Sequence, residues 1–387
     1  MWHRVGSIVV CLMALAGCAT QPRPPAVVHW QDQSFNYRAD RVSETMATLV
    51  ALDPALAAEL ADPAVRDLGR EQRIEYLMKL FFPQGLNRFA YAVGPSTGAA
   101  ETWRNKRGDC MSLTLLTYSA ARALAIPAQM QEVRVPVVID RRGHVDFLAG
   151  HVNVRFPDAP ALKLGSRNLP GGELIIDFEP QVGSKQRGRA LSDDQMLARF
   201  YNNRGAENFA QQSDDLAYAY FKAAIVVDPE FAAARRNLAQ LYLRHALVDD
   251  AERLLRQTIE LKDGSAASLR SLHGLLLSQG RATEAQQYAD LLQRYQDDDP
   301  YYWLGLGLDH IQHNRYVKAI DALERAATLA SGFEEIHRYL ALAYTRNGQQ
   351  EEARKQLVLL AAITHDPKDR GIDSRSIGRD AQQRSLQ

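Results

Sequence analysis

Cys110 is the residue whose type and place most directly suggest chemistry in this sequence. It stands at the start of a predicted helix, in which apolar residues recur at helical spacing until Pro127. The free N–H groups and the dipole of a helix N-terminus stabilise a thiolate anion, which is the nucleophilic form of cysteine. A thiol at this place predicts nucleophilic catalysis or, as the simpler alternative, a buried cysteine that packs as a small apolar residue.

A catalytic thiol also needs a base within hydrogen-bond reach and a group that orients the base. Two histidines fall in the region of predicted strands: His144 follows an Arg-Arg-Gly loop, whereas His151 opens an alternating strand. Asp177 lies within a strand that is otherwise apolar, where a carboxylate costs free energy unless it is paired. An imidazole on the neighbouring strand would be a fitting partner for this carboxylate.

The elements expected to position these residues follow an α+β order. Between residues 41 and 82 the apolar residues recur at helical spacing, and a further helix follows Cys110. From Gln129 the period changes to two, which predicts strands around residues 129–135, 152–156 and 174–178. Helices, a cysteine-headed helix and then an antiparallel meander predict an α+β domain.

Several short motifs in this region resemble the core of the transglutaminase-like superfamily. They are Gly-Asp-Cys at 108–110, Ala-Leu-Ala-Ile-Pro-Ala at 123–128, His-Val-Asn-Val at 151–154 and Ile-Asp-Phe-Glu-Pro at 176–180. The resemblance covers residues 95–180 and implies a papain-like fold with a Cys-His-Asp triad. It makes Cys110 the nucleophile, His151 the general base and acid, and Asp177 the residue that orients His151. It also places the backbone N–H of Cys110 in the oxyanion hole.

The sequence departs from the family's pattern at two places. An aromatic residue often follows the histidine and Leu-Asp-Pro often surrounds the acid, whereas this chain has Val152 and Asp177-Phe178. Glu179 is therefore a second candidate for the acid. The resemblance implies acyl transfer on a peptide or protein amide, as hydrolysis or as crosslinking, and we expect no cofactor.

The N-terminus predicts export and a lipid anchor. Residues 1–17 read as a signal peptide whose apolar run is too short for a bilayer span, which takes roughly 20 residues. The stretch Leu-Ala-Gly-Cys that ends at Cys18 resembles the lipobox of bacterial lipoproteins, which implies acylation of the Cys18 sulfur. Ala19 then implies sorting to the outer membrane, with the body of the protein in the periplasm.

The predicted export to the periplasm makes the number of cysteines informative. Of the three cysteines, Cys11 would leave with the signal peptide and Cys18 would carry lipid. Cys110 would then be an unpaired thiol in a compartment that oxidises thiols to disulfides. This favours a reagent over a packing residue.

The C-terminal half repeats with a period of 34 residues. Alanine recurs at this spacing, and a second register carries small residues at four of five positions: Ala217, Ala251, Ala285, Ala319 and Ala353, then Gly205, Ala239, His273, Gly307 and Ala341. The pattern resembles the tetratricopeptide repeat (TPR), a helix–turn–helix unit of this length. Residues 198–367 are expected to form five stacked repeats, an all-α solenoid whose concave face binds an extended peptide or a partner protein.

Composition and the remaining segments complete the expected organisation. The 46 basic and 46 acidic residues balance without a basic run, which disfavours nucleic-acid binding. His310 and His313 lie one turn apart without a third ligand nearby, so no metal site is expected. Three further segments are expected: a lipidated cysteine and linker at 18–38, a transglutaminase-like domain at 39–195, and a disordered tail at 368–387.

Two functions of different classes are compatible with these features. The first is a lipid-anchored periplasmic thiol enzyme that captures a protein or peptide with its repeats and acts on an amide through Cys110, His151 and Asp177. The alternative is a non-catalytic envelope adaptor or scaffold, in which the repeat groove and a transglutaminase-like fold only bind.

Overall fold

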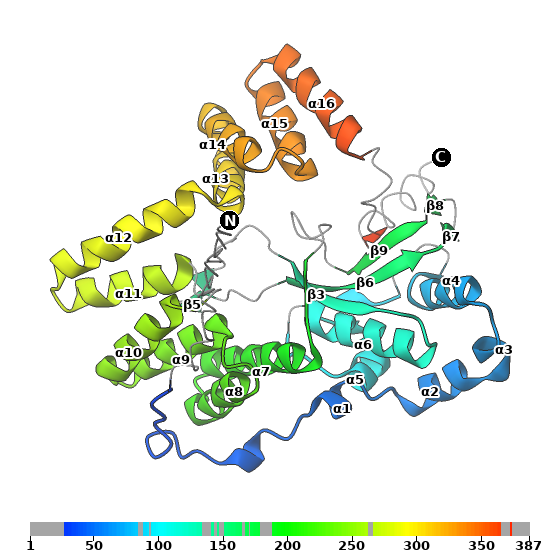
Figure 1. Ribbon diagram of the computed structural model, residues 1–387, viewed down its shortest axis with the longest axis horizontal. Coiled ribbons are helices and arrows are strands. Elements are labelled where there is room, and N and C mark those ends of the chain that lie inside the picture. The colour runs from blue at the N-terminus through cyan, green and yellow to red at the C-terminus, as the bar shows by residue number, and fades with distance from the viewer. Residues whose placement is uncertain are drawn as a thin grey trace, which may run out of the picture.

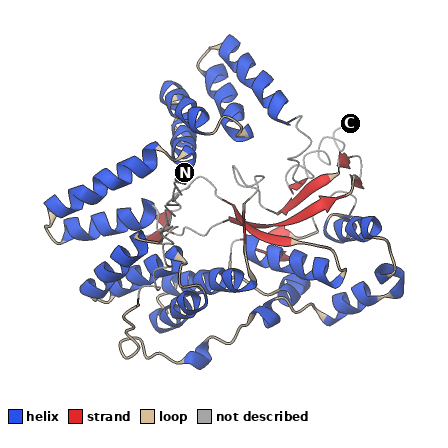
Figure 2. Ribbon diagram, viewed as in Figure 1, coloured by secondary structure: helices blue, strands red, loops and turns tan. Residues whose placement is uncertain are grey.

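The computed structural model describes most of the chain from residue 27 onward. The described residues are 27–83, 88–92, 94–133, 141–142, 145–146, 151–164, 167–169, 171–178, 188–261, 266–364 and 372–373. The signal peptide, Cys18, His144 and Glu179 lie outside them. Helices dominate the described part, together with a small group of strands (Figure 2). None of these helices has the length and apolar content that a membrane span requires.

Short helices open the N-terminal half. They are a 3₁₀ turn at Ala39–Arg41, α1 (Met46–Leu49), α2 (Pro54–Ala61), α3 (Pro63–Arg66), α4 (Arg70–Phe81), α5 (Ala99–Asn105) and α6 (Cys110–Ala123). Asp53 and Asp62 cap α2 and α3, and each is followed by a proline at the first helical position. A carboxylate cap satisfies a free N–H group, and proline there loses no helical hydrogen bond. The two prolines therefore start helices rather than break one long helix.

A five-stranded sheet within the described residues follows these helices. Its order is β10 (Arg189–Ala190), β3 (Gln129–Val133), β6 (His151–Ala159), β9 (Gly172–Asp177) and β11 (Ile372–Asp373). Shorter pairs are β1 (Ala90–Tyr91) with β2 (Arg107–Gly108), β4 (Arg141–Arg142) with β5 (Val145–Asp146), and β7 (Leu162–Leu164) with β8 (Arg167–Leu169). The three strands predicted from alternation are β3, β6 and β9, which are antiparallel neighbours.

Strand β11 differs from the expectation for the tail. Residues 368–387 were predicted to be disordered, but Ile372 and Asp373 pair in parallel with Ile176 and Asp177 of β9. The free backbone edge of β9 supplies the hydrogen-bond partners. A strand of two residues is too short to show alternation, so the sequence pattern does not predict it.

The apolar face of the sheet packs against α6. Val154 and Phe156 of β6 and Ile176 of β9 share one core cluster with Leu113 and Leu116 of α6. All five side chains are almost fully buried. The apolar sides of the strands and of α6 thus form a single apolar layer, in which α6 lies against the sheet (Figure 1).

The second half consists of consecutive helix pairs. They are α7 (Asp193–Ala210), α8 (Asp214–Val227), α9 (Ala232–Arg244), α10 (Val248–Ile259), α11 (Ala266–Ser278), α12 (Ala282–Asp297), α13 (Pro300–Gln312), α14 (Tyr316–Leu329), α15 (Glu334–Arg346) and α16 (Gln350–Thr364). Helices α8, α10, α12, α14 and α16 begin 34 residues apart, and so do α9, α11, α13 and α15. The predicted repeat period is therefore confirmed. The pairs follow one another in an arc from α7 to α16 (Figure 1).

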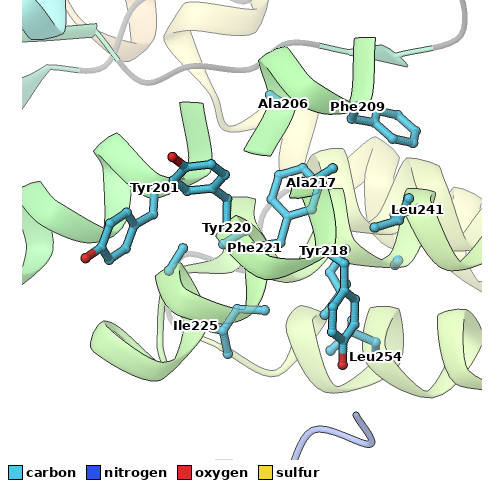
Figure 3. Close-up of a cluster of buried hydrophobic side chains, with 14 of the residues drawn as sticks. Tyr201, Ala206, Phe209, Ala217, Tyr218, Tyr220, Phe221, Ile225, Leu241 and Leu254 are labelled. Atoms are coloured by element: carbon cyan, nitrogen blue, oxygen red, sulfur yellow. The ribbon is translucent and has the colours of Figure 1, made fainter. Parts of the chain in front are cut away.

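Small residues mark the close contact within a pair, as the repeat pattern predicts. A Cβ added to Gly205 of α7 would lie 2.6 Å from the ring of Phe221 on α8. The same spacing recurs in the fourth pair, where a Cβ on Gly307 would lie 2.5 Å from Leu323. Figure 3 shows Phe221 among the buried side chains of the first pairs. Glycine is used here because a side chain would push the helices apart.

The first repeat helix packs against the sheet half. Met111 and Leu115 of α6 and Val152 of β6 belong to the same core cluster as Met196 and Phe200 of α7. That core continues through the first repeats, whereas α13, α14 and α15 have a core cluster of their own. The sheet half thus occupies the place that a preceding repeat would take in a longer solenoid.

Residues 27–38, which belong to the expected linker, lie against the repeats rather than apart from them. Phe35 is fully buried and stacks on Tyr218 of α8, with 4.6 Å between the ring centroids. Asp32 accepts hydrogen bonds from Nζ of Lys222 at 2.6 and 2.8 Å. The linker expectation does not hold for these residues, because their aromatic side chains gain apolar burial on the repeat surface.

Candidate active site

Cys110 is the first residue of α6, and Asp109 caps that helix. The Asp109 carboxylate accepts hydrogen bonds from the backbone N–H of Ser112 at 2.8 Å and from the Ser96 hydroxyl at 2.6 Å. An aspartate at this position satisfies a free N–H group and is stabilised by the helix dipole. Cys110 is a free, half-buried thiol. Its sulfur therefore lies where the helix N-terminus favours negative charge.

Gly108 allows the chain to pass close to α6 before this cap. A Cβ at this position would lie 2.8 Å from Cβ of Ser112 and 3.2 Å from Cγ2 of Thr102. Real Cβ atoms do not come this near, so a larger residue would displace the start of the helix. The Gly-Asp-Cys motif thus combines a close approach, a helix cap and a thiol at the helix N-terminus.

His151 and Asp177 are joined by a short hydrogen bond across neighbouring strands. Nε2 of His151 lies 2.6 Å from Oδ2 of Asp177, and the two side chains are only 5% and 3% exposed. Cys110 also interacts with the His151 side chain. Since Nε2 faces Asp177, Nδ1 is the ring nitrogen left for the thiol. The structure brings the three residues predicted from the sequence into one chain of contacts.

The environment of His151 favours its protonated form. Burial lowers the pKa of the ring, but the interactions with Asp177 and Cys110 outweigh burial and raise the pKa to about 10. The imidazole therefore holds its second proton at neutral pH. An imidazolium at this place can donate a proton to a leaving group, and Asp177 keeps the ring in one orientation.

Sequence reasoning missed two buried amides that extend this chain of contacts. Asn153 donates from Nδ2 to Oδ2 of Asp177 at 3.2 Å and accepts from Nε2 of Gln131 at 2.8 Å. Gln131 in turn accepts from the N–H of Gly188 at 3.1 Å. Gln131 and Asn153 are 0% and 1% exposed and lie opposite each other in the register of β3 and β6. Asn153 therefore binds the same Asp177 oxygen as His151, and Gln131 holds Asn153 in place.

The sequence pattern around these amides is compatible with either an exposed or a buried polar side of the strands. Polar residues alternate with apolar ones in β3 and at the start of β6, as in Gln129, Gln131, His151 and Asn153. Such alternation usually indicates that the polar side of a strand faces water. Here the polar side is buried around Asp177, which alternation alone does not distinguish.

The structure does not describe the alternative site residues His144 and Glu179, but it does describe Phe178, where the sequence departs from the family pattern. Asp177 is the carboxylate that His151 contacts, whereas His144 and Glu179 lie outside the described residues and stay untested. Phe178 is 5% exposed and stacks on Phe82 with 5.7 Å between the ring centroids. The residue after the acid is thus a core aromatic, which accounts for its departure from proline.

The described residues contain no cluster of His, Cys, Asp and Glu side chains suited to a metal ion. The pair His310 and His313 shares the carboxylate of Asp309, with Nδ1–oxygen distances of 3.5 and 3.3 Å. These are contacts within one turn of α13 and the residue that follows it.

Comparison with known proteins adds a partial fold likeness. No family model matches the sequence, and no curated protein matches it. Three similar solved structures are the MamA protein (23% identity, 43% of this chain and 91% of that chain, TM-score 0.23), YrrB, described as a TPR protein with an unusual peptide-binding site (15%, 44% and 87%, 0.24), and PilF of Pseudomonas aeruginosa (20%, 44% and 78%, 0.26).

These neighbours are TPR proteins, and each covers less than half of this chain. With TM-scores of this size, nothing about the activity of the chain follows from them. They give no support to the transglutaminase-like resemblance of the N-terminal half. That resemblance stays a prediction.

Proposed function

We propose that this protein is a thiol enzyme that transfers or hydrolyses the acyl group of a peptide or protein amide. The observation that carries the proposal is the chain of contacts between Cys110, His151 and Asp177. A thiol at a capped helix N-terminus interacts with a buried imidazole, which lies 2.6 Å from a buried carboxylate. A cysteine that only packs needs neither partner. The transglutaminase-like resemblance implies the same chemistry for these residues.

The proposed reaction has two steps, and His151 moves the proton in both. The Cys110 thiolate attacks the carbonyl carbon of the amide, and the developing oxyanion lies against backbone N–H groups at the N-terminus of α6. The C–N bond then breaks as the His151 imidazolium gives its proton to the departing amine nitrogen, which leaves a thioester. In the second step, His151 takes a proton from water or an amine that attacks the thioester. The C–S bond breaks and the thiolate is restored.

Asp177 and Asn153 have supporting parts in this scheme. Asp177 holds Nε2 of the ring, so that Nδ1 faces the thiol. Asn153 holds Asp177 in turn. Water as the second acceptor gives a protease or amidase, and an amine gives crosslinking.

The repeat half is proposed to capture the protein or peptide that is acted upon. A stack of helix pairs forms an extended concave surface, on which an elongated chain contacts several repeats at once. Substrate binding and chemistry would then be divided between the two halves. Nucleic acid is not the expected partner, because the charge of the chain is balanced.

The lipid anchor at Cys18 and the location at the outer membrane are part of the same proposal. Acylation of Cys18 would hold the protein at the periplasmic face of the outer membrane, since two or more acyl chains give stable anchoring. Cys18→Ser should release the protein from the membrane fraction or leave the signal peptide uncleaved. Unchanged processing and unchanged fractionation of this variant would exclude the lipid anchor.

The catalytic assignment is tested by the reactivity of Cys110 towards iodoacetamide at pH 6.5. Mass spectrometry of the peptide that contains Cys110 gives the rate without knowledge of the substrate. The thiol should react faster than free cysteine, whose pKa of about 8.5 leaves little thiolate at this pH. His151→Ala should slow alkylation. Asp177→Asn should slow it less, because the imidazole remains but loses its orientation.

His144→Ala is the control and should leave the rate unchanged. Slow alkylation of the unmodified protein, with no response to His151→Ala or Asp177→Asn, would make Cys110 a packing residue. The catalytic proposal would then fail.

A non-catalytic adaptor is the second candidate. The observation that favours it is the repeat array from α7 to α16, a protein-interaction architecture that can act by binding alone. An adaptor would keep its partner when Cys110 is replaced by alanine and would lose no other activity. Failure of the alkylation test together with retained partner binding would establish this candidate over the enzyme.

A further inference from the structure

One face of α7 carries three polar side chains that contact the sheet half. Arg199, Asn203 and Glu207 are spaced four residues apart, so they lie on the same side of the helix. Arg199 binds Glu132 of β3, whereas Asn203 and Glu207 bind Ser96, which precedes α5. We call Arg199, Asn203 and Glu207 the α7 stripe.

Ser96 links the α7 stripe to Asp109, the residue that precedes Cys110. Oε1 of Glu207 accepts from the backbone N–H of Ser96 at 2.9 Å, and Nδ2 of Asn203 donates to the Ser96 hydroxyl at 3.3 Å. That hydroxyl donates to Oδ2 of Asp109 at 2.6 Å. Ser96 is only 3% exposed, so water has little access to its hydroxyl. The cap of α6 therefore depends on a residue that the first repeat holds.

The other end of the stripe reaches the strand beside His151. Nε and Nη2 of Arg199 donate to the two oxygens of Glu132 at 2.9 and 2.7 Å, a two-pronged pair. Burial would raise the pKa of Glu132, but Arg199 and Arg189 outweigh it and lower the pKa. Glu132 is adjacent in β3 to Gln131, the amide that holds Asn153. The stripe thus contacts both the thiol side and the carboxylate side of the site.

The second and third repeats do not have this stripe. The 34-residue register places Leu241 and Leu275 at the position of Glu207, and both are buried in the repeat core. In those repeats this face meets another repeat, whereas in α7 it meets the sheet half. Burial raises the pKa of Glu207 to about 7, so ionising it there costs folding free energy. A costly carboxylate at a position that is apolar in the second and third repeats is typical of a functional contact.

We propose that Glu207 and Asn203 are positioning residues for Cys110. They hold Ser96, Ser96 holds Asp109, and Asp109 fixes the start of α6, which sets the thiol against His151. This inference rests on the proposed function, because it gives the repeat half a part in the same site. The first repeat is then a component of the site as well as a binding surface, and a partner that moves α7 changes the reactivity of the thiol.

The test is the alkylation rate of Cys110 by iodoacetamide in the full-length protein between pH 6 and 9. Glu207→Ala removes the acceptor for Ser96 and should slow the reaction at pH 6.5 about fivefold, the effect of one lost hydrogen bond. Glu207→Gln keeps a carbonyl oxygen at the same reach and should restore the rate to within about twofold. Rescue by the amide separates positioning from loss of packing.

Two further variants keep the test decisive if Glu207→Ala fails to fold. Ser96→Ala interrupts the same path without touching α7 and should also slow alkylation about fivefold. Glu252→Ala is the matched control, because this α10 carboxylate binds Arg256 and Arg281 within the repeats, both at 2.6 Å. It should leave the rate unchanged even where it lowers the unfolding temperature.

Three results would count against the inference or its basis. Unchanged rates in both Glu207→Ala and Ser96→Ala would overturn it, provided that His151→Ala still slows alkylation. An unchanged rate in His151→Ala as well means that the proposed function itself fails. Equal slowing in Glu207→Ala and Glu207→Gln would assign the effect to the charge of Glu207 and overturn the positioning role.

Discussion

The two ends of the repeat array differ in what covers them. At the α7 end, the sheet half and residues 27–38 lie against the first helix pairs, and Met196 and Phe200 are buried. At the α16 end, the apolar side chains of Leu357, Val358 and Leu359 are 53%, 65% and 46% exposed. Repeats contact mainly their neighbours, so an end without a neighbour leaves its apolar face in water unless another element covers it.

This difference shows where the repeats and the candidate site depend on each other. The contacts that cover α7 are the same contacts that hold Ser96 and Glu132 near Cys110 and His151. A change at the α7 end should therefore alter both stability and the reactivity of the thiol. Truncating the exposed side chains at the α16 end should alter neither, because Leu357, Val358 and Leu359 bury little apolar surface.

The largest effect is expected from Phe35→Ala at the α7 end. The ring is 0% exposed and stacks on Tyr218 at 4.6 Å and on Tyr242 at 6.0 Å between ring centroids. Truncating a buried aromatic costs about 3–5 kcal/mol. Urea unfolding followed by circular dichroism should show a clearly lowered midpoint. Val27→Ala, at a residue 85% exposed in the same segment, is the control and should change little.

An unchanged midpoint for Phe35→Ala would break the comparison. It would mean that residues 27–38 do not cover the α7 end in solution.

A smaller loss is expected from Gly205→Ala within the first helix pair. The new Cβ would lie 2.6 Å from the ring of Phe221, and overfilling a packed contact costs about 1–3 kcal/mol. Gly274→Ala in α11 is the matched control, because its Cβ would meet nothing within 4 Å. That substitution should stabilise the protein by about 0.5–1 kcal/mol, since alanine is the better helix former. Opposite signs in urea unfolding would support the close contact at Gly205, and equal signs would refute it.

Glu207→Gln should give a pH-dependent gain. Burial raises the pKa of Glu207 to about 7 from an ordinary value of about 4.5, although Ser96 and Arg204 oppose the rise. A raised folded-state pKa favours folding fully below about 4.5, and this contribution is lost as the pH rises through about 7. Glutamine does not ionise, so the variant should match the unmodified protein near pH 4.5 and exceed it by about 1–2 kcal/mol at pH 8.

Urea midpoints at the two pH values check this expectation. A gain of the same size at both values would show that the carboxylate is not the cause. A loss at pH 8 would show that the ion pair of Glu207 with Arg204 outweighs its burial.

The sequence predicted correctly those features that a regular spacing of residues within one helix, strand or repeat specifies. The 34-residue register placed Gly205 and Gly307 at close helix contacts, and the structure has both contacts. The change from helical spacing to alternation located strands β6 and β9, which carry His151 and Asp177. Cys110 at a helix N-terminus followed from Gly-Asp before an apolar helix. These features are local, so the residues that specify them are close in the chain.

The missed features depend on contacts between distant parts of the chain. Asp32 and Lys222 form a contact although they are 190 residues apart in the chain. No local sequence pattern predicts that residues 27–38 lie on the repeats. Glu207 is one of several polar residues on a predicted helix, and only its contact with the sheet half distinguishes it. Gln131 and Asn153 resembled the water-facing side of a strand for the same reason. Whether a polar side is exposed or buried depends on what covers it.

The smallest effect is expected from Leu357→Ala at the α16 end. Leu357 lies one repeat after Leu323, yet Leu323 is 0% exposed and Leu357 is 53% exposed. Leu323→Ala should cost about 2–5 kcal/mol, because it leaves a cavity in a packed core. Leu357→Ala should stay within about 0.5 kcal/mol, as surface substitutions do. Urea unfolding of the pair tests the comparison directly. A loss at Leu357 as large as that at Leu323 would mean that the α16 end is covered in solution, and the two ends would then be alike.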